Sequence, residues 1–260
     1  MFVYPQLGSG ALSQFPLRKR RRMRTVVNRA ADGRAIRLPD TPAEVIEWQL
    51  EYADLSDDEM AAIRQFFESV EGTLNGFTFL DPTSNLLAWS DQLGNAVWQK
   101  GPLLTIASGV ADPFGETKAW AIANQGAGAQ ALMQTLAAPA GYQYCLSAHL
   151  RANQATTVTL LAGSQRAERA VDSQWTRATF SASGDPTGES IGFGLELPAG
   201  AGVEVFGIQA EPQSGASGYK PSTTGGTFEN ARLRDDLLTI TTTGVNRHSC
   251  TINIIHANHL

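Results

Sequence analysis

Apolar and polar residues alternate along residues 45–52. One face carries the large apolar side chains Ile46, Trp48, Leu50 and Tyr52, and the other carries Val45, Glu47, Gln49 and Glu51. A period of two is typical of a half-buried β-strand. We therefore predict a strand here with one face against a core.

A helix is predicted directly after this strand. Ser56 and Glu59 have the spacing of a capping box, and Leu55 and Met60 that of a hydrophobic staple. The apolar positions that follow repeat at helical spacing: Met60, Ile63, Phe67 and Val70. Gly72 ends the run. The segment GFTFLDP, residues 76–82, then predicts another strand, with Phe77 and Phe79 on one face.

A second pattern fills residues 85–224. Short apolar runs, each bounded by Gly, Pro, Ser or Asn, recur at even spacing. In the run GYQYCLSAHLRA the apolar face carries Tyr144, Leu146, Ala148 and Leu150, and in SIGFGLELP it carries Ile191, Phe193, Leu195 and Leu197. Many short strands of this kind are typical of a β-sandwich or jelly roll.

Residues 225–260 contain a β-hairpin pattern that has no core of its own. Leu238, Ile240 and Thr242 alternate up to a turn at Gly244, and a second strand follows through Ile252 and Ile254. An isolated hairpin is marginally stable, so we expect it to pair with the N-terminal sheet. The predicted fold is mainly β with one short helix. A small domain, residues 1–84 and 225–260, is interrupted by an inserted sandwich, residues 85–224.

Composition agrees with a globular protein rich in strands. The 260 residues are 42% hydrophobic and 17% charged, with 25 Gly and 12 Pro. Cys145 and Cys250 lie far apart and lack metal or redox spacing, so we expect buried thiols. No signal-peptide pattern and no membrane-spanning run is found, so we expect synthesis in the cytoplasm and no insertion in a membrane.

The most concentrated charge lies in LRKRRRMR, residues 17–24. It comprises Arg18, Lys19, Arg20, Arg21, Arg22 and Arg24. Such a cluster can bind phosphates of nucleic acid, because each neutralised phosphate releases a counterion. The chain, however, has net charge −5, and no aromatic residues interleave with the basic ones. We therefore favour an arm that docks on an acidic neighbour, such as Glu47 and Glu51 of another copy, and expect no nucleic acid.

Two resemblances extend this interpretation. The order EWQLEYADLS, DDEMAAIRQFFESVEG, FTFLDP, preceded by arginines, resembles the N-terminal region of distal or minor tail proteins of long-tailed bacteriophages. That resemblance implies a hub domain whose copies form a ring, a hexamer in the family, at the tail tip. It implies the tail tube protein and other tail-tip proteins as partners, and the virion as the location.

The second resemblance covers residues 85–224. The motifs NLLAWS, AVWQK, YCLSAHLRA, QWTRATFSA and VFGIQAEPQSGASGYKPST resemble carbohydrate-binding-module-like jelly rolls of phage tail proteins and secreted glycosidases. It implies a glycan on the host surface as the ligand of this module.

No catalytic constellation is found. The histidines His149, His248, His256 and His259 lack metal-ligand spacing, and the paired carboxylates Asp57 and Asp58 suit a helix start. We expect no enzymatic activity and no cofactor.

Candidate glycan contacts come from the polar faces of two strands. If the runs around His149 and Glu196 share a sheet, they form a polar platform with bare glycine backbone. The candidates for stacking on a sugar ring are Trp89, Trp120 and Tyr142. The polar candidates are Gln143, His149, Arg151 and Glu196. The alternative is an ordinary solvated sheet face.

The function favoured by these patterns is structural. We expect a phage tail-tip hub that joins the tail tube to the adsorption apparatus and displays a jelly roll that binds glycans. One alternative is a stand-alone carbohydrate-binding protein or a module of a secreted glycosidase, which the missing signal peptide and the split domain disfavour. A nucleic-acid-binding protein is the other alternative.

Overall fold

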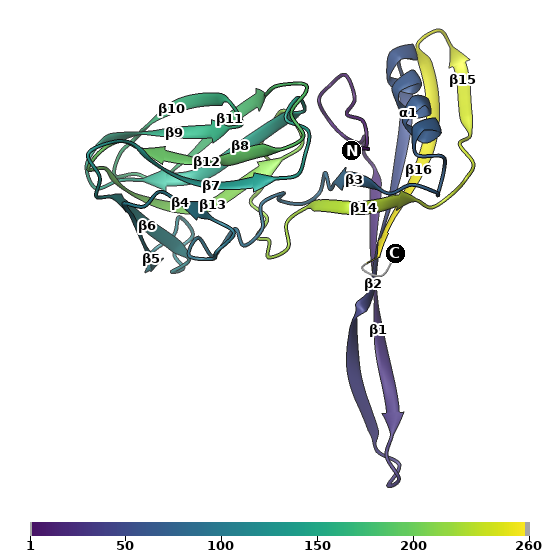
Figure 1. The fold of residues 1–260 in the computed structure, drawn as a ribbon, viewed down its shortest axis with the longest axis horizontal. Coiled ribbons are helices and arrows are strands. Elements are labelled where there is room, and N and C mark those ends of the chain that lie inside the picture. Colours follow the sequence, from purple (N-terminus) through teal and green to yellow (C-terminus); the bar gives the residue numbers. More distant parts are fainter. Residues whose placement is uncertain (1, 258–260) are drawn as a thin grey trace. The chain divides into compact units, whose positions relative to one another are not determined.

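The computed structural model describes residues 2–257, which form sixteen strands and one helix (Figure 1). The chain divides into two compact units. The first comprises residues 2–8, 13–79 and 228–257, and the second residues 9–12 and 80–227. The predicted fold class is confirmed: mainly β, one short helix and a β-sandwich. The predicted boundaries, at 84/85 and 224/225, lie a few residues from the changes of unit in the structure.

The first unit is built on one antiparallel sheet. Its strands are β1 (Leu17–Arg29), β2 (Ala35–Leu55), β3 (Phe77–Leu80), β14 (Thr227–Leu233), β15 (Ile240–Gly244) and β16 (Arg247–Ala257). The strand order is β1-β2-β16-β14-β3, and β15 pairs with β16. The C-terminal strand β16 thus lies between β2 and β14, with Leu50 opposite Ile252.

The alternation predicted for β2 largely holds. Trp48, Leu50 and Tyr52 are buried, whereas Ile46 is only half-buried. Val45, predicted on the polar face, is also buried. It lies between Arg22 of β1 and Ala257 of β16, whose backbones flank it on both sides.

The helix α1 (Asp57–Ser69) begins where the capping box predicts. The Ser56 side chain accepts from the Glu59 backbone, and the Glu59 carboxylate accepts from the Ser56 backbone. The helix ends in a Schellman motif, with the Gly72 N–H bonded to the Phe67 carbonyl. Glu71, at φ 54°, and the predicted Gly72, at φ 63°, are both in the left-handed conformation.

One predicted core position in α1 is wrong. Phe66, and not Phe67, is buried, together with Met60 and Ile63. The Phe66 ring lies 5.2 Å from that of Tyr4 and 4.8 Å from that of Phe77, both edge to face. These rings select the side of the helix that packs on the sheet.

The far half of the β1–β2 hairpin extends away from the rest of its unit (Figure 1). Four apolar side chains between residues 23 and 38 are exposed, from 48% for Leu38 to 72% for Met23, with Val27 and Ile36 between these values, and Val26 is half-buried. A two-stranded ribbon without a covering layer is marginally stable in water. This segment therefore gains from contact with another surface.

The second unit is a sandwich of two five-stranded antiparallel sheets. We call the sheet β10-β9-β12-β7-β4 sheet A and the sheet β11-β8-β13-β6-β5 sheet B. The strands of sheet A are β4 (Gln99–Lys100), β7 (Gln130–Leu136), β9 (Thr156–Ala162), β10 (Gln165–Val171) and β12 (Ile191–Leu197). Those of sheet B are β5 (Leu104–Val110), β6 (Ala119–Asn124), β8 (Gln143–Arg151), β11 (Thr176–Ser183) and β13 (Gly202–Glu211).

The predicted inward faces of β8 and β12 form the sandwich core. Tyr144, Leu146, Phe193 and Leu195 are completely buried, and the Tyr144 and Phe193 rings lie 5.2 Å apart. Cys145 and Cys250 are free, buried thiols, as predicted. Burial raises the pKa of Cys250 to about 11.

The two ends of the sandwich are joined by a buried amide. The Asn85 side chain donates to the Ile208 carbonyl at 2.9 Å and accepts from the N–H groups of Leu87 and Ala210. Farther along, Ser90 and Ser222 share three hydrogen bonds. The segments that enter and leave this unit therefore lie side by side.

No helix within residues 2–257 has the length and apolarity needed to cross a membrane.

Replacing Phe66 with alanine should destabilise the first unit by about 3–5 kcal/mol, because it leaves a cavity between Tyr4 and Phe77. Phe67→Ala, one position away and half-exposed, is the matched control and should cost distinctly less. Urea unfolding read by hydrogen exchange in α1 measures both. Equal losses for the two variants would contradict the observed helix orientation.

Asn85→Ala should destabilise the second unit by roughly 2–5 kcal/mol, because three buried backbone groups lose their partner. Asn95→Ala removes one bond at a partly exposed turn, to Val97 N–H, and serves as the control. Thermal unfolding of the two variants decides. A loss for Asn85→Ala no larger than for Asn95→Ala would show that the buried amide does not join the ends.

Candidate functional site

The outer face of sheet B, pointing away from sheet A, carries most of the exposed chemistry of the second unit. Since Tyr144, Leu146, Ala148 and Leu150 fill the core, the intervening residues of β8 face outward. The register places His149 opposite Arg177 of β11 and Phe206 of β13. It also places Arg151 opposite Glu204.

An ion pair crosses this face. The Arg151 guanidinium contacts the Glu204 carboxylate and lies 4.8 Å from the centroid of the Trp175 ring. Both side chains of the pair are less than one third exposed. The pair is thus held by charge on one side and by cation–π contact on the other.

A phenylalanine lies over the middle of the face. Phe114 is 71% exposed, yet its ring contacts those of His149 and Phe206, with centroids 5.9 and 5.8 Å away. The loop that carries it is fixed by Asp112, whose carboxylate accepts from the N–H groups of Phe114 and Glu116. The ring is therefore exposed by a well-defined turn.

His149 lies beneath this ring and is half-buried. Burial and the neighbouring Arg177 lower its pKa, and a hydrogen bond to the Phe206 backbone opposes them. Its Nδ1 atom has no hydrogen-bond partner within residues 2–257. The Arg177 guanidinium donates from Nη2 to the Ser147 hydroxyl at 2.9 Å.

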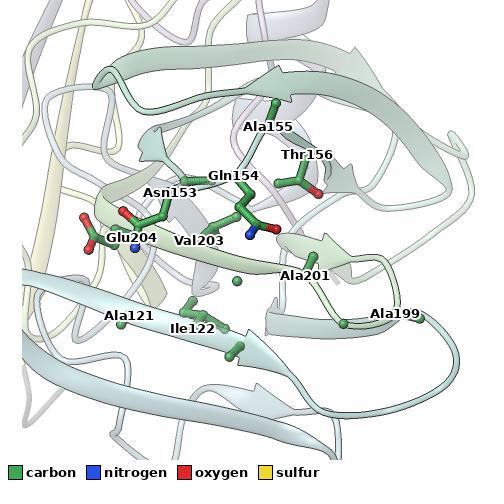
Figure 2. A pocket seen from close by; sticks show the side chains of 14 residues that line it. Ala121, Ile122, Asn153, Gln154, Ala155, Thr156, Ala199, Ala201, Val203 and Glu204 are labelled. Atoms are coloured by element: carbon green, nitrogen blue, oxygen red, sulfur yellow. The ribbon is translucent and has the colours of Figure 1, made fainter.

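A pocket of about 470 Å³ opens where the loops after β8 and β12 cross between the two sheets, and Glu204, the partner of Arg151, is part of its lining. Figure 2 shows Asn153 and Glu204 at one end of the pocket, Ala199 at the other and Gln154 between them. Strands β6 and β13 and the two loops after β8 and β12 supply its lining. Small side chains leave the space, and amide, hydroxyl and carboxylate groups line it.

A final segment, residues 212–222, is fastened beside this face. The Gln209 side chain binds the Gly218 carbonyl and the Lys220 N–H, and buried Glu211 binds Ser217 and Lys220. The Tyr219 ring packs on Phe206, with centroids 5.2 Å apart. The segment EPQSGASGYKPST, residues 211–223, is thus fixed to strand β13 of this face by hydrogen bonds and by the Tyr219 ring.

The predicted stacking residues do not lie on this face as open platforms. Trp120 is half-buried, donates from Nε1 to the Asp91 carbonyl and lies against Gly94. The Trp89 carbonyl accepts from the buried Trp98 ring. Tyr142 is mostly shielded, and burial raises its pKa to about 12. Gln143 is half-buried against Gly10.

The assumption that the strands around His149 and Glu196 share a sheet is wrong. Strand β8 belongs to sheet B and β12 to sheet A, so His149 and Arg151 point away from Glu196. Glu196 pairs with Arg166 at 2.6 Å. The glycines beside it are covered as well, since Met133 packs against Gly192 and Gly194.

The structure instead gathers His149 and Arg151 with residues that sequence reasoning missed, chiefly Phe114, Arg177, Phe206 and Gln154. Phe114 carried a usable signal. It is the fourth residue of ADPFGE, residues 111–116, where Asp, Pro and Gly indicate a tight turn that exposes the residue between Pro and Gly.

The basic segment folds as strand β1 against the chain's own acidic residues. Arg18 pairs with Glu51, Arg21 with Glu44 and Arg24 with Asp40, and Lys19 lies over the Trp48 ring. Glu47, predicted to receive a neighbouring copy, pairs with Arg234 of the same chain. Within residues 2–257, Arg20 and Arg22 have no acidic partner.

In the part of the chain from residue 2 to 257, no group of three or more His, Cys, Asp or Glu side chains could hold a metal ion.

No protein-family model and no curated protein matches the sequence. Similar folds among solved structures include carbohydrate-binding modules and a phage tailspike domain. The CBM22-1 xylan-binding domain of Paenibacillus barcinonensis Xyn10C matches with 13% identity and a TM-score of 0.42, covering 51% of this chain and 96% of that domain.

Two further structures show the same level of similarity. The C-terminal family 22 carbohydrate-binding module of Clostridium thermocellum Xyn10B matches with 9% identity and a TM-score of 0.38, over 53% of this chain and 98% of the module. The enzymatically active domain of tailspike protein 4 of bacteriophage CBA120 matches with 13% identity and a TM-score of 0.39. That match covers 51% of this chain and 22% of the tailspike chain. These scores carry no conclusion about a ligand.

Lowering the pH below about 6.5 should weaken the second unit through His149. Its folded pKa lies below the ordinary value of 6.5, so the unfolded chain binds more protons and stability falls as the pH falls. Unfolding measured from pH 7 to pH 5 should show a shallower pH dependence for His149→Gln than for the unchanged protein. Identical pH dependence in both would contradict the effect.

Proposed function

We propose that the second unit binds a glycan on the outer face of sheet B, and that the first unit assembles copies of the chain into a ring at a phage tail tip. The observation that carries the binding half is the exposed Phe114 ring, held over His149 and Phe206 on a face that also carries Glu204 of the polar pocket. The face therefore offers an aromatic surface and hydrogen-bonding groups together.

The Phe114 ring suits a saccharide because a sugar presents C–H groups on one side of its ring. An aromatic side chain buries such a surface and gains contact energy. Because Asp112 already fixes the loop, little conformational freedom is lost on binding.

The pocket that Glu204 lines supplies hydrogen-bonding partners for the hydroxyl groups of a sugar. Asn153 and Gln154 each carry an amide that both donates and accepts, Thr156 carries a hydroxyl, and Glu204 accepts. Ligand pockets combine small numbers of such groups with apolar lining, here the alanines of β6 and of the loop before β13. A neutral sugar ring fits this chemistry.

The assembly half is supported by the β1–β2 hairpin. Across it, Val26 pairs with Leu38 and Asn28 with Ile36, which gives one face of the ribbon three apolar side chains in a row. Arg20 and Arg22 add charge without an acidic partner in their own chain, within residues 2–257. A neighbouring copy or a tail tube protein would cover the apolar face and supply acidic side chains.

The alternatives are ranked by the same contacts. A free carbohydrate-binding protein would use the binding face equally but leaves the exposed hairpin without a purpose. Nucleic-acid binding is disfavoured because three arginines of the basic segment already pair with acidic side chains. Because exposed ion pairs are weak, these arginines could also exchange their partners for acidic side chains of a neighbouring copy.

The proposed location is the phage tail tip, with the tail tube protein and other tail-tip proteins as partners and no catalytic step. By the family resemblance the ring is a hexamer. A ring presents several binding faces at once, so weak contacts combine and avidity rises by about 10² or more over a single contact.

Phe114→Ala should lower glycan affinity by about tenfold without changing the melting temperature, since the removed ring is mostly exposed. Phe15→Ala, a 77% exposed phenylalanine of the first unit, is the control and should leave affinity unchanged. A glycan array followed by calorimetry on the best oligosaccharide gives both values. Equal affinity for the two variants would refute this position of the site.

Arg20→Ser with Arg22→Ser should reduce self-association, measured by analytical ultracentrifugation, while leaving the circular dichroism unchanged. Arg21 is left in place because it pairs with Glu44. The control double variant, Arg166→Ser with Arg169→Ser, removes two arginines of the second unit. Unchanged assembly together with salt-sensitive binding of DNA by the unmutated protein would favour the nucleic-acid alternative.

A further inference from the structure

One cation on the outer face of sheet B lacks a counter-charge. Arg151 pairs with Glu204, and Lys220 pairs with buried Glu211. Arg177 lies between these two pairs along the face, and its nearest polar contact is the neutral Ser147 hydroxyl. Within residues 2–257 no carboxylate lies within ion-pair distance of it. We infer that the glycan bound at this face is acidic, and that Arg177 binds its carboxylate.

The inference rests on the proposed glycan-binding function and specifies the class of ligand. A half-buried guanidinium is costly to keep without a compensating anion. A sugar hydroxyl could accept a hydrogen bond from Arg177, but it would not neutralise the charge. A planar carboxylate can do both, because it matches the fork of donors on a guanidinium.

Unsatisfied polar atoms gather around the same residue. Six buried side-chain atoms within residues 2–257 lack a hydrogen-bond partner, and three of them belong to this cluster: Arg177 Nε, His149 Nδ1 and Trp175 Nε1. Native structures satisfy nearly all buried polar groups, so a local concentration of exceptions calls for a reason. A polar ligand group at this position, reached with a shift of the Phe114 ring, provides one.

The register connects this cluster to the pocket. Arg177 of β11 lies opposite His149 of β8, and His149 lies opposite Phe206 of β13 on its other side. Glu204, two residues before Phe206 in β13, lines the pocket. Strands β11, β8 and β13 are successive neighbours, so the span across the sheet is about 10 Å. The ligand that reaches both places is therefore an oligosaccharide, with its acidic sugar over β11 and a neutral part in the pocket.

The decisive experiment compares ligands that differ only in charge. Oligogalacturonate, oligoalginate and hyaluronan fragments are titrated into the full-length chain, each beside the same oligosaccharide with its carboxylates reduced to primary alcohols. We expect at least one acidic probe to bind ten times or more tightly than its reduced form. Added salt should weaken binding of the acidic form only.

Variants then assign the effect to a residue. Arg177→Gln should abolish the preference for the acidic form, so that the variant binds the acidic and the reduced probe with affinities within about twofold of each other. Arg177→Lys, which keeps charge but not the fork of donors, should restore part of it. Arg166→Gln, an exposed arginine on the opposite sheet, is the control and should change nothing.

Three results would overturn the inference. Equal affinity for acidic and reduced probes would refute it and leave the glycan function standing. A preference that survives Arg177→Gln, or that dextran sulfate reproduces, would show a general effect of charge. Binding of neither probe class, and of no neutral glycan on the array, would refute the glycan function itself and the inference with it.

Discussion

The pairing of β16 with β2 is the constraint on which the first unit depends. It joins Leu50 to Ile252, about 200 residues apart, and places β16 in the interior of the sheet, where both of its edges are bonded. Closing so long a loop by a disordered chain would cost entropy, although the cost grows slowly with length. Here the residues between the two strands fold into the sandwich, and the Gly226 N–H donates to the Leu86 carbonyl. Because this hydrogen bond brings the two ends of the sandwich together, only the short segments outside it have to be closed as a flexible loop.

The face proposed to bind a glycan depends in turn on backbone register. Residues 149, 177 and 206 come from three strands that are distant in sequence, and only antiparallel pairing brings them onto one surface. None of the three belongs to a sequence motif that indicates a binding site. Together with a turn that fixes Phe114, they give an arrangement in which charge, aromatic surface and hydrogen-bonding capacity adjoin. The function proposed for this unit therefore depends on sheet topology more than on any sequence motif.

Local features could be predicted from the sequence, and pairing across the fold could not. The capping box at Ser56 and the alternation through Trp48 depend on neighbours in the chain, and both were predicted. Phe66 and Phe67 both lie near the apolar stripe of α1, so contact with Tyr4 decided between them. The assignment of Glu196 failed for a similar reason: strand identity was evident, but which of two sheets a strand joins depends on partners far away.

The adjacency of the two ends of the sandwich makes this unit exchangeable as a cassette. A recombination event that replaced residues 80–227 with another domain whose ends lie equally close would leave the pairing of β2 with β16 intact. Variation in what the chain recognises would then be separated from variation in how it assembles. A lineage could change one without losing the other, because selection on the sheet of the first unit and selection on the inserted sandwich would act on different residues.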